Sequence, residues 1–289
     1  MRVVHNESGL EAVSAGALVP TMGALHEGHL ALVRRAASLD GPLVVSIFVN
    51  PTQFDARDDL DRYPRTLDAD VQAADKAGAD VVFAPDVQTM YPPDHEIPIP
   101  PLPTVATTPG LEDAHRPGHF AGVCQAVVRL FDLVRPSAAI FGEKDYQQLL
   151  VVTDMVRAEP QRWPGLEIIG HPTVRDVDGL ALSSRNARLP AAERDRALGL
   201  WRALESSRRS AHEGTRATES QMHRILTEHR LEIDYAVLRD AQTLHALGET
   251  PADPARALVA ARLGDVRLID NIAVSDQQDV ALAKQELVS

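Results

Sequence analysis

The chain has 289 residues, of which 44% are hydrophobic and 24% charged, as is usual for a soluble globular protein. Its net charge of −12 argues against a broad nucleic-acid surface, and no stretch is apolar enough to span a membrane. The single cysteine, Cys124, cannot form an internal disulfide, so we expect a cytoplasmic protein. From the charge and the lack of an apolar span, we expect that it binds neither nucleic acid nor membrane.

Apolar runs alternate with helical patterns through the first part of the chain. This alternation predicts a parallel α/β sheet with right-handed crossovers. The expected strands cover residues 16–21, 42–50, 79–85, 137–142 and 166–174, and the expected helices cover 28–39, 65–78, 119–134 and 146–158.

Local features refine these elements. The helix over 28–39 should place Leu30, Val33 and Ala37 on one face. Eight of the twenty prolines lie between Pro85 and Pro109, which predicts extended segments and turns there. Cys124 lies in an apolar helical run, so we expect it to be a core residue and not a nucleophile.

The pattern of expected helices and strands changes near residues 172–176. Helices are expected over 191–214 and Glu219–His229, followed by a strand over 231–240 and a hairpin of two strands around Gly264-Asp265. We therefore predict two domains, residues 1–173 with the parallel sheet and residues 174–289 as a smaller α+β domain.

The first polar segment is "TMGALHEGH", Thr21–His29, directly after an expected strand. Gly23 allows a close backbone approach, and the helix that opens at Gly28 and His29 favours an anion at its N-terminus. His26 and His29 could both donate N–H groups to one phosphate. Two surface histidines beside a helix start are the simpler alternative, and a metal site is a weaker one because no third ligand is apparent.

Two further segments carry phosphate-binding side chains. "FGEKDYQQL", Phe141–Leu149, places Lys144 at the end of a strand and Gln148 one turn onward. "DGLALSSRN", Asp178–Asn186, follows a glycine with two hydroxyls and a guanidinium, a suitable clamp for a polyphosphate. A solvated lysine is the alternative for the former segment, and the latter lacks the pattern of a serine nucleophile.

A fourth segment, "SIFVNPTQF", leaves Gln53 in a loop expected beside the first segment, and "RPGHF" adds Arg116 and His119 before a helix. The segments contain no pair of general-base carboxylates and no activated nucleophile. Donor-rich loops at strand ends are typical of phosphoryl or nucleotidyl transfer, in which the protein positions reactants and neutralises charge.

These motifs, together with "YPRTLDAD" and "LGDVRLIDN", occur in the same order in the pantoate–β-alanine ligase family, which the chain resembles from about Val19 to Asn271. The family belongs to the nucleotidyltransferase group, and "HEGH" is similar to the His-x-Gly-His motif of that group. The resemblance implies a Rossmann-like larger domain with a C-terminal lid, a homodimer, and ATP-dependent joining of pantoate to β-alanine through pantoyl adenylate, with release of AMP and pyrophosphate.

The resemblance also implies roles for individual residues. His26, His29, Lys144, Ser183, Ser184 and Arg185 would be catalytic, with His29 as a proton donor, and Gln53 and Gln148 would bind pantoate. Gln53 would contact β-alanine as well. The ATP site would comprise Met22, Gly23, Ala24, Leu25, His26, Glu27, Gly28, His29, Gly142, Glu143, Lys144, Asp145, Val174, Leu182, Ser183, Ser184 and Arg185. Mg²⁺ would be held mainly by the ATP phosphates, without a protein metal site.

Other readings remain open at this point. Another nucleotidyltransferase or a fragment of a tRNA synthetase would share some of the motifs. A non-catalytic nucleotide-binding regulator would need only the fold and the first segment. The presence of Lys144 and of Ser183, Ser184 and Arg185 favours an enzyme.

Overall fold

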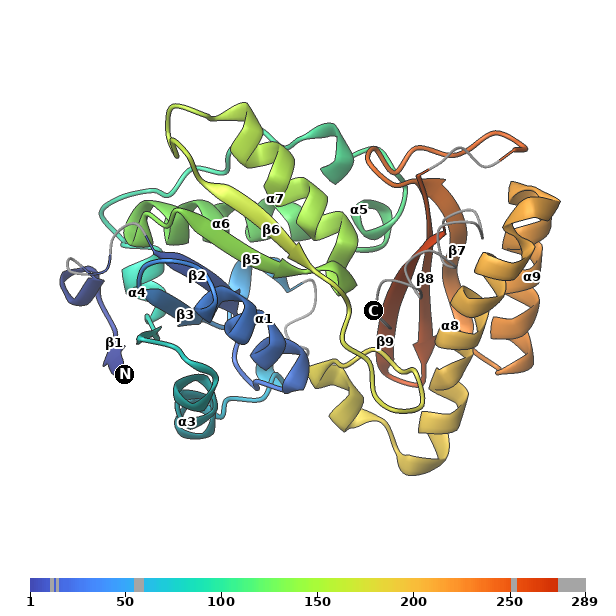
Figure 1. Ribbon diagram of the computed structural model, residues 1–289, viewed down its shortest axis with the longest axis horizontal. Helices are drawn as coiled ribbons and strands as arrows, with labels where there is room; N and C mark the ends of the chain where they lie inside the picture. The colour runs from blue at the N-terminus through green and yellow to red at the C-terminus, as the bar shows by residue number, and fades with distance from the viewer. Residues whose placement is uncertain (11–12, 14–15, 55–59, 251–253, 275–289) are drawn as a thin grey trace, which may run out of the picture. The chain divides into compact units, whose positions relative to one another are not determined.

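The structure is a computed structural model that describes residues 1–10, 13, 16–54, 60–250 and 254–274. The chain divides into two compact units, Met1–Val174 and Arg175–Ser289. The first unit contains a six-stranded parallel sheet and the second a three-stranded antiparallel sheet, which confirms the predicted α/β fold with a smaller α+β part (Figure 1). The roles expected of the two parts stay predictions.

The parallel sheet has the strand order β1-β4-β3-β2-β5-β6. Its strands and helices alternate along the chain, as the sequence predicted. They are β1 (Arg2–Val4), β2 (Ala17–Thr21), α1 (Glu27–Ala37), β3 (Leu43–Ile47), α3 (Leu67–Ala77), β4 (Val81–Phe83), α4 (Val87–Met90), α5 (Glu112–His115), α6 (His119–Val134), β5 (Ala138–Gly142), α7 (Tyr146–Ala158) and β6 (Glu167–His171).

The core of this unit forms because the central strands are apolar on both faces. Val19 of β2 and Val45 of β3 pack against Val33 of α1, whereas their neighbours Leu18 and Val44 point to the opposite face and are fully buried too. α6 contacts β2, and α7 contacts β5 and β6. A sheet covered on both faces leaves its strand ends as the places where polar groups can collect.

Two details of the first unit differ from expectation. The buried face of α1 consists of Leu32, Val33 and Ala36, and Leu30 packs against the same core. The prediction was therefore right for Leu30 and Val33 and wrong for Ala37, which is exposed. The three-residue edge strand β1, which pairs with β4, was missed because so short a run carries no periodic pattern.

The Pro85–Pro109 region holds only α4 and a short 3₁₀ turn, as its prolines predicted. The segment 54–66 is rich in Asp and Arg and has no apolar periodicity, a pattern that predicts a mobile wall over the pantoate pocket. Residues 55–59 of that segment lie outside the described residues.

The second unit packs α8 (Ala191–Ser210) and α9 (Thr215–Glu228) against the sheet formed by β7 (Glu232–Asp240), β8 (Ala255–Leu263) and β9 (Val266–Val274). The predicted hairpin around Gly264 is confirmed by the β8–β9 register. α9 begins four residues before the predicted start at Glu219. Its first turns bury Thr215 and Thr218, and the Thr218 hydroxyl donates to the Gly214 carbonyl, so polar residues occupy what becomes a buried face.

None of the helices within the described ranges has the length and apolar character needed to cross a membrane.

Candidate active site

The strand order brings two of the polar segments to one edge of the parallel sheet. β2 pairs with β3 on one side and with β5 on the other, so the chain reverses its direction of winding at β2. Open α/β sheets bind their ligands at the carboxyl ends of strands at such a switch point. The segment Met22–His26 follows β2, and Glu143–Asp145 follows β5. The candidate site of the first unit is built on this edge.

His26 and His29 lie at the start of α1. His26 is the N-cap residue, and its backbone N–H donates to Nδ1 of His29 at 3.4 Å. The two imidazole rings are stacked with centroids 4.0 Å apart and planes 30° apart. Because Nδ1 of His29 accepts a hydrogen bond, the proton of its neutral ring is on Nε2.

Both rings are uncharged at neutral pH. Burial lowers the pKa of His26 to about 4, with the positive charge of Lys144 as the second cause. Burial lowers the pKa of His29 to about 3, with His26 as the second cause and a smaller contribution from Lys144. Asp145 opposes both shifts. The pair can therefore donate N–H groups to an anion without itself carrying charge.

Lys144 supplies the positive charge of this cluster. Its side chain is 18% exposed, and its Nζ lies 3.4 Å from a carboxylate oxygen of Asp145. Beside it, Nδ1 of His26 is buried and has no hydrogen-bond partner among the described residues. A buried polar atom of this kind usually has a partner in the functional state, and a ligand could supply it.

Gln53 lies in the turn after β3 and reaches the first segment. Its Nε2 donates to Sδ of Met22 at 3.1 Å, and its Oε1 accepts from Nδ2 of Asn50 at 3.0 Å. Asn50 is buried, and its own Oδ1 accepts from the hydroxyl of Tyr91 at 2.8 Å. The Gln53 amide is thus oriented by a buried chain of hydrogen bonds.

The backbone of Gln53 is held as well. Its carbonyl accepts from Nη2 of Arg116 at 3.1 Å and from Nδ1 of His119 at 2.9 Å. Nη1 of Arg116 also lies 3.0 Å from Nε2 of His119, which must accept because a guanidinium cannot. His119 is therefore neutral with its proton on Nδ1. Arg116 and His119 fix the Gln53 turn.

A glycine lets this turn approach α6. A Cβ on Gly122 would lie 2.2 Å from the carbonyl oxygen of Thr52, and the Gly122 carbonyl accepts from Nδ2 of Asn50 at 3.0 Å. Only glycine permits so close an approach of two backbones.

Gln148 is on the first turn of α7 and is only partly buried. Its neighbour Gln147 is 3% exposed and fully engaged: its Nε2 donates to the Val105 carbonyl, and its Oε1 accepts from the backbone N–H of Glu112, each at 2.9 Å. Gln147 therefore has a structural role, and Gln148 is the amide that remains accessible.

The third polar segment belongs to the second unit. Ser183 caps a 3₁₀ turn, Ser184–Arg188, and its hydroxyl oxygen accepts from the backbone N–H of Arg185 at 3.3 Å. The preceding loop is closed by a bridge between Arg175 and Ala181. Val174 is the last residue of the first unit, and Leu182 enters the turn.

The base of this loop is held by an ion pair and a stacked aromatic ring. The Arg175 guanidinium binds both oxygens of Asp270, at 2.6 and 2.9 Å, and lies 4.1 Å from the ring centre of Trp201. Gly179 has a φ of +94°, and a Cβ there would lie 2.2 Å from Trp201. Stacking of Trp201 over the loop thus requires glycine at this position.

Sequence reasoning missed Asn50, Tyr91 and Asp70. Asp70 is buried on α3, and its carboxylate accepts from the backbone N–H groups of Ala24 and Leu25. A signal was available, because Asp70 shares a helix face with the buried Ala74 and Ala77, where an apolar residue would be usual.

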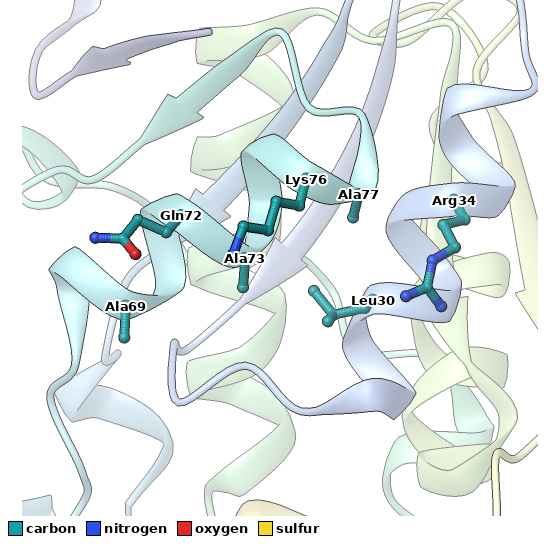
Figure 2. A pocket seen from close by; sticks show the side chains of 7 residues that line it. All are labelled: Leu30, Arg34, Ala69, Gln72, Ala73, Lys76 and Ala77. Carbon is teal, nitrogen blue, oxygen red and sulfur yellow. The ribbon is translucent and has the colours of Figure 1, made fainter.

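A surface groove of about 310 Å³ lies between α1 and α3 (Figure 2). It is lined by Leu30, Arg34, Ala69, Gln72, Ala73, Lys76 and Ala77. The lining includes none of the residues predicted to bind ATP or pantoate, so we do not assign the site to this groove. Within the described part of the chain, no three His, Cys, Asp or Glu side chains are grouped so that they could hold a metal ion.

Comparison with known proteins gives a consistent result. The sequence profile of the family described as Pantoate-beta-alanine ligase matches residues 2–273. A pantothenate synthetase of Rubrobacter xylanophilus is 48% identical over 274 residues, which cover 89% of this chain and 90% of that protein. One from Bacteroides thetaiotaomicron is 45% identical over 285 residues, which cover 94% of this chain and 98% of that protein.

Solved structures agree with the sequence comparisons. A pantothenate synthetase crystal structure from Thermus thermophilus has a TM-score of 0.88 and 42% identity, and covers 95% of this chain and 99% of its own. A pantoate-beta-alanine ligase from Francisella tularensis, complexed with beta-gamma ATP and beta-alanine, has a TM-score of 0.76 and 30% identity, and covers 94% of this chain and 97% of its own.

Proposed function

The chain belongs to the pantoate–β-alanine ligase family, and from that membership we propose that it joins pantoate to β-alanine with ATP, through a pantoyl adenylate intermediate. The Francisella relative was crystallised with an ATP ligand and β-alanine, which supports both as ligands of this chain. Pantoate is the remaining reactant named by the family.

The proposed reaction has two steps. A carboxylate oxygen of pantoate attacks the α-phosphorus of ATP, and the bond from that phosphorus to the pyrophosphate oxygen breaks. The amine of β-alanine then attacks the carbonyl carbon of the adenylate, the bond to AMP breaks, and the amine loses a proton. Neither step requires a covalent bond to the protein, which suits a site made of hydrogen-bond donors and cationic side chains.

One observation carries this proposal. The neutral rings of His26 and His29 and the charge of Lys144 come together at the carboxyl ends of β2 and β5. Lys144 would balance charge on the phosphates, and the two imidazoles would donate N–H groups as charge develops at the α-phosphate. His29 would act through its Nε2–H as a hydrogen-bond donor, because its lowered pKa disfavours an imidazolium.

The remaining assignments are proposals of the same kind. Gln53, oriented by Asn50, and the accessible Gln148 would bind pantoate. Ser183, Ser184 and Arg185 would bind ATP phosphates, together with the backbone of Met22–His29 and Gly142–Asp145 and with Val174 and Leu182. The backbone N–H groups of Ala24 and Leu25 would not bind phosphate, because both donate to the carboxylate of Asp70.

We also propose that Mg²⁺ enters with ATP. Bound to the phosphates, it would neutralise charge and assist departure of pyrophosphate. The described residues offer no cluster of metal ligands, so ATP oxygens would be its main ligands. Family membership further suggests a homodimer in the cytoplasm, which sedimentation and fractionation can test.

The deciding experiment is isotope exchange. Labelled pyrophosphate should exchange into ATP when pantoate and Mg²⁺ are present and β-alanine is absent. Omission of pantoate should abolish exchange, and amino acids should not replace it, because polar groups that bind hydroxyls would be left unpaired. Exchange that requires β-alanine would exclude a separate adenylate step. A nucleotide-binding regulator would not exchange at all, and a synthetase relative would exchange with an amino acid.

A further inference from the structure

The turn that precedes His26 has an unusual backbone. Gly23 has a φ of +82° and Ala24 a φ of +50°, so two consecutive residues are left-handed. This conformation costs an alanine about 1 kcal/mol or more, because its Cβ approaches the following carbonyl. Something in the structure must therefore stabilise the turn.

The stabilising group is the carboxylate of Asp70. Its Oδ2 accepts from the backbone N–H of Ala24 at 2.9 Å, and its Oδ1 accepts from the backbone N–H of Leu25 at 2.7 Å. The hydroxyl of Thr66 donates to Oδ2 at 3.1 Å. Successive N–H groups in a left-handed turn form a concave site for an anion, and here a side chain of the protein fills it.

The fit around this carboxylate is tight. Asp70 is 3% exposed, and a Cβ on Gly23 would lie 3.0 Å from Oδ2 of Asp70 and 3.1 Å from Cγ2 of Ile47. Hydrogen bonds from N–H groups to a buried carboxylate are stronger than those to neutral acceptors. Asp70 therefore ties the first turn of α3 to the loop that ends at the stacked histidines.

We propose that Asp70 is a positioning residue for nucleotide use: it holds the Gly23–Leu25 turn so that His26 and His29 are in place before ATP binds. This inference rests on the proposed function, because it assigns the histidines to ATP. Asp70 touches no reactant itself. Its loss should impair the ATP-dependent step much more than the binding of pantoate, which involves Gln53 on a different loop.

The test compares Asp70→Asn with Asp68→Asn. Asp68 lies on the same helix turn but is exposed, so both variants remove one negative charge near the start of α3. In Asp70→Asn, kcat/KM for ATP should fall about tenfold or more, because one charge-assisted contact is lost. The KM for pantoate should change less than about twofold. Asp68→Asn should match wild type.

A spectroscopic readout separates positioning from general stability. In protein labelled with ¹⁵N-alanine and ¹⁵N-leucine, the amide protons of Ala24 and Leu25 should move upfield in Asp70→Asn and stay in place in Asp68→Asn. Unchanged amide shifts, or a folded Asp70→Asn variant with kcat/KM for ATP within about twofold of Asp68→Asn, would overturn the proposal.

A second variant covers the case in which Asp70→Asn does not fold. Thr66→Val removes one of the three donors to Asp70 and keeps the carboxylate. Its kcat/KM for ATP should therefore fall about threefold, with little change in the KM for pantoate. Equal losses for the two substrates would count against positioning. Pyrophosphate exchange by wild-type protein is run in parallel: its absence would refute the proposed function, whereas the amide shifts would still report whether Asp70 holds the turn.

Discussion

The imidazole rings of His26 and His29 stack with centroids 4.0 Å apart, and the backbone N–H of His26 donates to Nδ1 of His29. The hydrogen bond fixes the tautomer of His29, and burial keeps both rings neutral because it lowers the pKa of each well below 6.5. The proposed ATP site thereby gains two uncharged donors beside the cation Lys144.

The lowered pKa values predict how stability depends on pH. Each histidine has a pKa of about 6.5 when unfolded and about 3 to 4 when folded, so the unfolded chain binds more protons in that interval. Their contribution should be complete above about pH 6.5 and lost as the pH falls toward 4. Thermal melting of wild type and of a His26→Gln/His29→Gln variant should show this.

Because other groups titrate in the same range, the difference between the two melting curves is the informative quantity. The difference in melting temperature should be constant above about pH 6.5. Below that pH, the melting temperature of the wild type should fall more than that of the variant. A difference that does not change with pH would mean that the histidines are not buried in neutral form. Activity should also be largely lost in the variant while folding is retained at neutral pH.

Lys144→Ala should slow the proposed formation of the adenylate about 10²-fold or more, as removal of a preorganised charge partner usually does. The KM for pantoate should change little, because Lys144 is proposed to act on phosphate. Lys76→Ala is the matched control, since Lys76 lines the surface groove between α1 and α3. Pyrophosphate exchange measures the effect, and a near-normal rate at saturating ATP would remove Lys144 from the mechanism.

Because Gln53 is proposed to bind pantoate, the hydrogen-bond chain behind it predicts graded changes in the KM for pantoate. Asn50→Ala removes the group that orients the Gln53 amide and should raise the KM for pantoate about tenfold. Tyr91→Phe removes only the hydroxyl that donates to Asn50, so an increase of about twofold to threefold is expected. Steady-state kinetics with ATP saturating checks the order. A larger effect of Tyr91→Phe than of Asn50→Ala would contradict it.

The buried ion pair of the second unit should matter for stability. Arg175→Ala leaves Asp270, whose side chain is 2% exposed, without its bidentate partner, and should reduce the free energy of unfolding by about 3 kcal/mol. Arg157→Ala breaks an exposed pair with Asp154 and should cost about 0.5 kcal/mol or less. Chemical denaturation distinguishes the two, and equal effects would show that the Arg175 pair is not buried in solution.

Cys124 should be inert in the native protein. Burial raises the pKa of its thiol to about 12, so the reactive thiolate is nearly absent at mildly alkaline pH. A thiol reagent should label it only after denaturation and should leave the activity of the native enzyme unchanged. Rapid labelling of folded protein would show that this part of α6 opens.

Local pattern was sufficient for most of the architecture. Continuous apolar runs predicted the parallel strands, and the helices α6 and α7 begin and end where their periodicity predicted. The ordered motifs predicted the family, which the comparisons confirm. These features follow from residues close together in the sequence, because helix period, strand alternation and turn chemistry are local properties.

Only the tertiary structure decided how the polar residues act. The pKa values of His26 and His29 depend on burial and on Lys144, which reaches them because β5 pairs with β2. The amides of Ala24 and Leu25 look available for a phosphate in the sequence, yet Asp70 of α3 takes them. Desolvation, charge and hydrogen-bond partners are set by segments far apart in the chain, so no local pattern contains them.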